Sequence, residues 1–238
     1  MPADDQNNKR ITIECNGCYK VEGDIPLVRK VQVVSEYGEP LTWKKEETIP
    51  AEPPYFLCRC GHSHTPPFCD STHFEIDFDG TETADLSPTA ERQQIYPDTT
   101  GIVIKRDKSL CMESGFCGNR LGNIRKLGPQ TADPQVRAQV MAMIERCPSG
   151  SYAYALEAGG ADVEPDFPAQ IAVTVEITAE GPIRGPLWVT GDIPIEQSDG
   201  KLLEGRNRVT LCNCGESKNK PLCDGTHRAL PERKITQA

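Results

Sequence analysis

The protein is a chain of 238 residues with a formal net charge of −9, and aromatic residues make up only 6% of it. This acidic balance excludes nucleic acid and anionic membranes as expected partners, because both are bound through basic patches. The polar start lacks the apolar core of a signal peptide, and no run approaches the ~18 apolar residues of a membrane span. We therefore expect a soluble, cytoplasmic monomer, and the presence of 11 cysteines favours metal ligation over a disulfide framework.

Residues 11–80 are predicted to form a β-rich module. Alternating apolar residues at 11–14 and the run 30–34 predict half-buried strands. Four candidate metal ligands follow at the spacing C-x-C-x8-C-x3-H, namely Cys58, Cys60, Cys69 and His73. Two cysteines one residue apart can converge on one metal atom from an extended loop, and a Cys and a His four residues apart share a helix face.

Other cysteines and histidines of this module lie outside that spacing. Cys15 and Cys18 form a lone C-x2-C without the helix or thioredoxin-like context of a redox dithiol. We expect ordinary, partly buried thiols there, with a supplementary ligand or a disulfide as the alternatives. His62 and His64 are expected to be solvated loop residues.

Residues 99–158 form a different, middle segment between polar or Gly- and Pro-rich linkers near 79–97 and 159–168. A strand is predicted at 101–105. Asp133 and Pro134 suit the N-cap and first position of a helix that ends before Pro148. Its apolar face is expected to consist of Val136, Val140, Met143 and Ile144.

The middle segment carries three further candidate ligands, Cys111, Cys117 and Cys147. Their spacing, with Pro148 after the last cysteine, resembles single-cluster ferredoxins and the divergent mono-cluster 4Fe-4S domains. Ser114 stands where such ferredoxins have their middle cysteine. The resemblance implies a [3Fe-4S] cluster on three cysteines. The alternatives are a [4Fe-4S] cluster completed by Glu113, Ser114 or a cysteine from elsewhere, and a domain without a cluster.

Residues 171–232 repeat the first module. Strands are predicted at 171–177 and 208–211, and residues 185–195 align with residues 17–27. The spacing C-x-C-x8-C-x3-H recurs in full at Cys212, Cys214, Cys223 and His227. Such a repeat predicts two copies of one metal-binding unit.

Three thiolates and one imidazole suit zinc as well as iron, so ligand chemistry alone leaves both open. Residues 212–227, however, resemble the CDGSH or NEET family of iron–sulfur proteins at each motif position. Residues 58–73 resemble it too, with Ser71 in place of the family's glycine. The resemblance implies a [2Fe-2S] cluster in each module. Each C-x-C pair would hold an inner iron. The outer iron would be held by Cys69 and His73 in the first module and by Cys223 and His227 in the second.

The family resemblance also implies a fold and a behaviour. We expect a β-rich α+β protein in which two CDGSH modules form an intramolecular pseudo-two-fold pair, with a ferredoxin-like domain inserted between them. A histidine ligand is expected to couple the redox step to protonation and to make the clusters labile in acid.

The sequence contains no P-loop, dinucleotide fingerprint or nucleophile elbow. All 4 histidines lie in the cluster loops, so none remains for a catalytic arrangement with Ser or Cys. We therefore expect a protein that is not an enzyme and that acts in electron transfer, cluster transfer or redox sensing. Its partner is expected to be a redox partner protein or a cluster acceptor. The alternatives are a structural zinc-binding interaction protein and an electron-donating accessory subunit of an enzyme.

Overall fold

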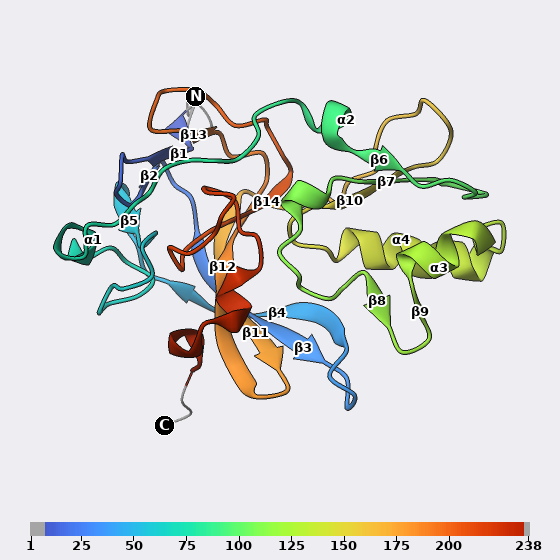
Figure 1. Ribbon diagram of the computed structural model, residues 1–238, viewed down its shortest axis with the longest axis horizontal. Coiled ribbons are helices and arrows are strands. Elements are labelled where there is room, and N and C mark those ends of the chain that lie inside the picture. Colours follow the sequence, from blue (N-terminus) through green and yellow to red (C-terminus); the bar gives the residue numbers. More distant parts are fainter. Residues whose placement is uncertain (1–7, 236–238) are drawn as a thin grey trace, which may run out of the picture.

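Strands dominate the computed structural model, which describes residues 8–235 (Figure 1). The longer strands are β1 (Arg10–Ile13), β2 (Tyr19–Glu22), β3 (Leu27–Val34), β4 (Pro40–Ile49), β5 (Tyr55–Leu57), β7 (Val103–Arg106), β10 (Tyr152–Ala155), β11 (Gln170–Thr178), β12 (Gly181–Thr190) and β14 (Arg208–Leu211). Two-residue strands are β6 (Gln94–Ile95), β8 (Gly118–Asn119), β9 (Gly122–Asn123) and β13 (Ile195–Glu196).

Helices are few and mostly short. The α-helices are α1 (Thr72–Glu75), α2 (Thr89–Arg92), α3 (Ile124–Leu127) and α4 (Pro134–Glu145), and 3-10 turns cover Lys108–Leu110, Gly128–Gln130, Thr226–Ala229 and Pro231–Arg233. Within residues 8–235, no helix has both the length and the apolar character that crossing a membrane requires.

The predicted strands and the predicted helix are confirmed. Helix α4 begins at Pro134, and the side chain of Asp133 accepts a hydrogen bond from the backbone N–H of Gln135 at 2.7 Å. The helix ends at Glu145, before Pro148. Three of the four residues expected on its apolar face are buried, and Val136 is partly buried. The local signals of the sequence therefore placed this element correctly.

The two modules exchange strands. The two larger sheets have the orders β13-β1-β2-β5 and β14-β12-β11-β3-β4, and in each a strand of one module lies parallel to a strand of the other (Figure 1). Ile11 lies opposite Ile195 in the first sheet. Ile171 lies opposite Leu27 in the second. Leu27 and Ile195 are equivalent positions of the repeat, so the two sheets follow the same pairing plan.

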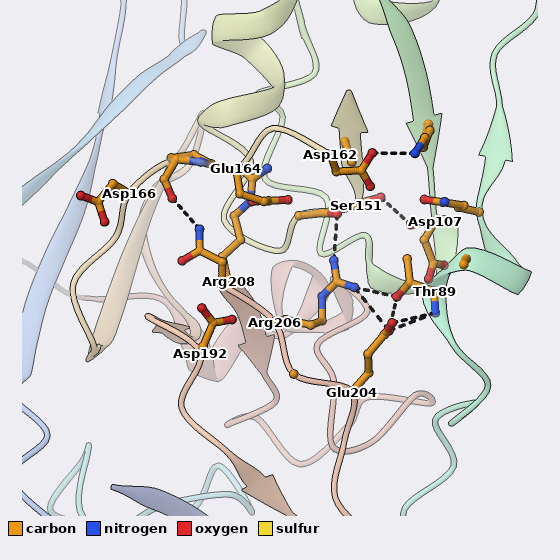
Figure 2. A pocket seen from close by; sticks show the side chains of 18 residues that line it. Thr89, Asp107, Ser151, Asp162, Glu164, Asp166, Asp192, Glu204, Arg206 and Arg208 are labelled. Atoms are coloured by element: carbon orange, nitrogen blue, oxygen red, sulfur yellow. Dashed lines mark hydrogen bonds and ion pairs between the residues drawn. The ribbon is translucent and has the colours of Figure 1, made fainter. Parts of the chain in front are cut away.

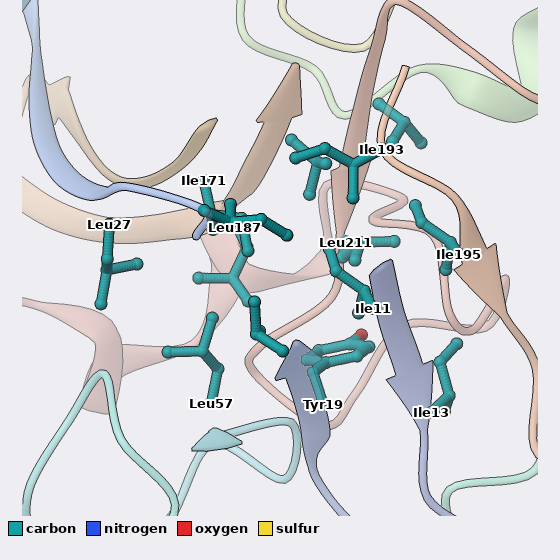
Figure 3. Packing of buried hydrophobic residues seen from close by; sticks show 14 of the residues in the cluster. Ile11, Ile13, Tyr19, Leu27, Leu57, Ile171, Leu187, Ile193, Ile195 and Leu211 are labelled. Atoms are coloured by element: carbon teal, nitrogen blue, oxygen red, sulfur yellow. The ribbon is translucent and has the colours of Figure 1, made fainter. Parts of the chain in front are cut away.

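One hydrophobic core serves both modules. Figure 3 shows side chains from both repeats in contact, and nearly all are fully buried. The labelled members are Ile11, Ile13, Tyr19, Leu27, Leu57, Ile171, Leu187, Ile193, Ile195 and Leu211. Because burial of apolar area provides most of the folding free energy, the two modules must fold together.

The longer insert of the first module forms strand β4, which pairs with β3. Trp43 of this strand contacts Phe116 of the middle segment, with 5.7 Å between the ring centroids. It also contacts Trp188 of β12, at 5.9 Å. The insert therefore connects the middle segment to the second module.

The middle segment has its own small sheet, β10-β7-β6, with α3 and α4 packed beside it. Arg208 of β14, which lines a cavity of about 680 Å³ (Figure 2), anchors it. This guanidinium donates to the carbonyls of Ile144, Glu145 and Cys147 at 2.8 to 3.0 Å. Its Nε also lies 2.9 Å from Glu164. Arg208 thus satisfies carbonyls that the end of α4 leaves free.

Candidate metal centres

The two repeated motifs bring their ligands together in pairs. The Sγ atoms of Cys58 and Cys60 lie 3.8 Å apart, and those of Cys212 and Cys214 lie 3.6 Å apart. The thiol of Cys69 lies 3.4 Å from Nδ1 of His73. In the second module, the distance from Cys223 to Nδ1 of His227 is 3.3 Å. Each motif therefore presents one thiol–thiol pair and one thiol–imidazole pair.

These distances fit ligand pairs on single metal atoms. In a tetrahedral site with metal–sulfur bonds of about 2.3 Å, two sulfurs lie ~3.8 Å apart, and a sulfur and a nitrogen somewhat closer. Within residues 8–235, no three His, Cys, Asp or Glu side chains gather around one point as a single metal ion requires. Each pair therefore fits two ligand positions of one tetrahedral metal atom.

The inner pairs of the two modules lie back to back. Gly61 and Gly215, which follow the C-x-C pairs, have φ angles of +86° and +83°, which favour glycine. A Cβ at Gly61 would collide with the carbonyl of Cys214, and a Cβ at Gly215 would collide with that of Cys60. This reciprocal contact requires the two glycines.

Ser71, the departure from the family's glycine, keeps the loop conformation. Its φ is +74°, and that of its counterpart Gly225 is +90°. A side chain in this region costs roughly 1 kcal/mol. The substitution therefore removes no ligand and adds modest strain to the first loop.

One thiol of each inner pair is prepared for deprotonation. The thiol of Cys60 and backbone N–H groups of the loop lower the pKa of Cys58 to about 6. The corresponding groups of the second module lower the pKa of Cys212 to about 6. Thiolates are the form that binds metal, so one thiol of each pair readily takes the ligand form. The hydrogen bond to that thiol raises the pKa of its partner, Cys60 or Cys214, so the second proton leaves less readily.

The outer pairs differ between the modules. Nε2 of His227 lies 2.9 Å from a carboxylate oxygen of Glu176, and both side chains are fully buried. Glu176 is also ion-paired with Arg228. His73 instead packs against Phe74, whose side chain is 76% exposed, with 4.1 Å between the ring centroids. The contact of Glu176 with the histidine ligand was not predicted from the sequence. The sign of it there is that Glu176 is an acidic residue within the apolar run 171–177.

The structure places the lone C-x2-C beside the first metal centre. Cys15 is exposed, whereas Cys18 is buried and its Sγ lies 3.2 Å from a carboxylate oxygen of Glu14. Burial, this hydrogen bond and the neighbouring Cys69 thiol raise the pKa of Cys18. His62 and His64 are exposed, as expected.

The three cysteines of the middle segment come together. Cys147 follows α4 and is buried, and Cys111 and Cys117 are half-buried. Burial raises the pKa of Cys117, and the thiols of Cys147 and Cys111 raise it further. Ser114, at the position of the missing cysteine, is buried in the same loop.

This middle loop packs on the outer ligands of the second module. A Cβ at Gly225 would lie 2.9 Å from Cγ of Glu113. Gln32 of β3 donates to the carbonyl of Ser114 at 3.1 Å and accepts from the backbone N–H of Ile177 at 3.0 Å. The buried side chain of Gln32 thus joins both modules to the middle segment.

Comparison with known proteins agrees with this geometry. Residues 16–74 and 184–228 match the family described as iron-binding zinc finger, CDGSH type. Residues 98–157 match the divergent 4Fe-4S mono-cluster family. Comparison with curated proteins and with solved structures finds no match. The chain therefore carries two CDGSH-type iron-binding segments with a divergent 4Fe-4S mono-cluster segment between them.

Proposed function

We propose that this chain is a monomeric, non-enzymatic electron carrier with a [2Fe-2S] cluster in each CDGSH loop and a third cluster in the middle segment. The ligand pairs carry the proposal, since each motif offers one thiol–thiol pair and one thiol–imidazole pair at 3.3 to 3.8 Å, which suits one iron for each pair. Bound clusters would supply one-electron redox chemistry. The protein's part is to hold, bury and separate them.

For the middle segment we propose a [3Fe-4S] cluster on its three cysteines. Ser114 replaces the middle cysteine of the ferredoxin pattern, which leaves three thiols for three irons. The alternative is a [4Fe-4S] cluster completed by Glu113, Ser114 or a cysteine from elsewhere. EPR distinguishes the two, because an oxidised [3Fe-4S] cluster is paramagnetic.

The exchanged strands support a pseudo-two-fold pair of modules. The equivalent pairings of Ile11 with Ile195 and of Ile171 with Leu27 would be related by such an axis. So would the reciprocal contacts of Gly61 and Gly215 with the facing cysteine carbonyls. The axis would pass between the two inner ligand pairs.

The contacts suggest an order for electron flow. The middle loop touches the second module's outer loop at Gly225, and the two inner pairs meet at Gly61 and Gly215. The first module's outer pair lies beside exposed Phe74, on α1 at the left edge of the molecule in Figure 1. We propose that electrons pass between the middle segment and a partner protein through the second and then the first module.

Electron delivery should therefore depend on the α1 surface. We expect Phe74→Lys to slow reduction of a basic cytochrome by about tenfold, since a positive charge at the exit repels this partner and interrupts the apolar contact. Leu121→Lys, at a residue 78% exposed in the middle segment, is the matched control and should leave the rate unchanged. Stopped-flow absorbance measures both, and equal rates for the two variants would contradict the proposed exit.

A further inference from the structure

A cleft beside the inner ligand pairs is basic, although the chain as a whole is acidic. It has a volume of about 190 Å³, and three arginines line it, namely Arg29 of β3, Arg184 of β12 and Arg233 of the last 3-10 turn. No Asp, Glu or Lys among the described residues lines this cleft. In a chain with a net charge of −9, such a local excess of positive charge indicates a site for an anion.

Arg233 is a buried cation without a carboxylate partner. It is 4% exposed, and its guanidinium donates to the backbone carbonyls of Arg184, Gly185 and Asn213 at 3.2 to 3.3 Å. It also donates to Oδ1 of Asn213 at 2.7 Å. None of the ion pairs within residues 8–235 includes Arg233 or Arg184. Neutral acceptors thus satisfy the N–H groups of Arg233, and no carboxylate of the described chain balances its charge.

The other two buried arginines of the described chain do have carboxylate partners. Arg59 lies 3.7 Å from a carboxylate oxygen of Glu82. Arg208 lies 2.9 Å from a carboxylate oxygen of Glu164. Because a buried charge without a counter-charge is costly, proteins normally provide one. The counter-charge of Arg233 must therefore come from the clusters or from a bound anion.

The remaining lining residues suit an anion that has an apolar body. Apolar surface comes from Pro66, Pro67, Val173 and Val175. Arg29 already pairs with Glu47 at 2.7 Å, which leaves Arg184 as the unpaired, partly buried cation of the cleft. A guanidinium can donate two parallel hydrogen bonds to one carboxylate. Since pockets for drug-sized ligands have volumes of ~300–1,000 Å³, this smaller cleft suits a small molecule.

We propose that this cleft binds a small organic carboxylate with an apolar body, and that the bound anion lowers the reduction potential of the first module's cluster. Arg184 and Arg233 attract the carboxylate, and the apolar walls receive the rest of the molecule. Cys58, an inner ligand of the first module, lines the same cleft, so the anion binds beside that cluster. Only the redox part of the inference rests on the proposed function.

Binding of the anion and reduction of the cluster oppose each other. A negative charge beside the cluster disfavours the addition of an electron, so the anion binds the oxidised protein more tightly than the reduced protein. An affinity ratio of about tenfold between the two states corresponds to a lowering of the potential by about 59 mV for one electron. The concentration of the carboxylate would thus regulate how readily the first module accepts an electron.

Isothermal titration calorimetry of the iron-loaded full chain with benzoate tests the binding. We expect saturable binding of benzoate, and binding weaker by about tenfold or more for benzamide, which has the same shape without the charge. Inorganic phosphate has the charge without an apolar body and should also bind more weakly than benzoate. Absence of saturable benzoate binding, or equal affinity for benzamide, would overturn the inference, and the arginines would then only offset the charge of the clusters. Tighter binding of phosphate would overturn the assignment to an organic ligand.

A variant and a redox titration complete the experiment. Arg184→Gln should weaken benzoate binding by about tenfold, because a charge-assisted hydrogen bond is lost. Arg125→Gln, at the exposed Arg125 of α3, is the matched control and should bind benzoate normally. Equal affinities of the two variants would contradict the role of Arg184. The comparison of benzoate with benzamide uses the unmodified chain, so a folding defect in a variant leaves the test decisive.

The redox part is measured by EPR-monitored titration with and without saturating benzoate. We expect benzoate to lower the first module's potential in the unmodified chain and to have much less effect at the same concentration in Arg184→Gln. An unchanged potential in the unmodified chain would contradict this part. Absence of iron and sulfide before the titration would refute the proposed function instead, and calorimetry on the same chain would still decide whether the cleft binds the carboxylate.

Discussion

Glu176→Gln is expected to raise the reduction potential of the second module's cluster by tens of millivolts and to leave the first module's potential unchanged. The buried carboxylate lies 2.9 Å from Nε2 of His227, and a negative charge there opposes the addition of an electron. Hydrogen bonds and net charge around a cluster set its potential, and for one electron 59 mV corresponds to a tenfold change in equilibrium. The first module's outer histidine packs against Phe74 instead.

An EPR-monitored redox titration measures this shift. Glu180→Gln is the matched control, because Glu180 lies on the β11–β12 turn and its side chain is 70% exposed in an ion pair with Lys234. That variant should keep both potentials. If Glu176→Gln shifts neither potential, the carboxylate does not tune His227.

Arg208→Leu is expected to destabilise the protein by about 3 kcal/mol or more and to remove the middle segment's cluster. The buried guanidinium satisfies three carbonyls, including that of the proposed ligand Cys147, and pairs with Glu164. Removing one partner of a buried ionic network typically costs ~3–5 kcal/mol, because the remaining groups stay desolvated. Urea unfolding and iron content per chain measure the two effects.

Arg125→Leu provides the comparison, since Arg125 is exposed on α3 of the same segment. Its effect on unfolding should stay within about 0.5 kcal/mol. Normal iron content and stability in Arg208→Leu would show that the middle cysteines are held independently of β14.

Local features of the sequence predicted the elements and the ligand sets. The N-cap at Asp133 and the repeated cysteine spacing are properties of short segments, so the chain order alone reveals them. The strand exchange was not predicted. Leu27 pairs with Ile171 across more than half of the chain, and apolar alternation indicates a strand without naming its neighbour.

The surroundings of the ligands were equally beyond prediction. Glu176 and Arg208 act through contacts with residues far away in the sequence, which only the fold brings near. Each left a weak signal: an acidic residue in an apolar strand, and an arginine in a buried strand. Such breaks in a local pattern indicate positions with a specific partner.

Iron and acid-labile sulfide analysis of a variant without the middle cysteines tests the central claim most directly. With Cys111, Cys117 and Cys147 replaced by Ala, two [2Fe-2S] clusters predict about four iron atoms and about four sulfides per chain. The variant should be EPR-silent when oxidised and paramagnetic when reduced. A colourless protein with about two zinc ions per chain and no sulfide would contradict the account.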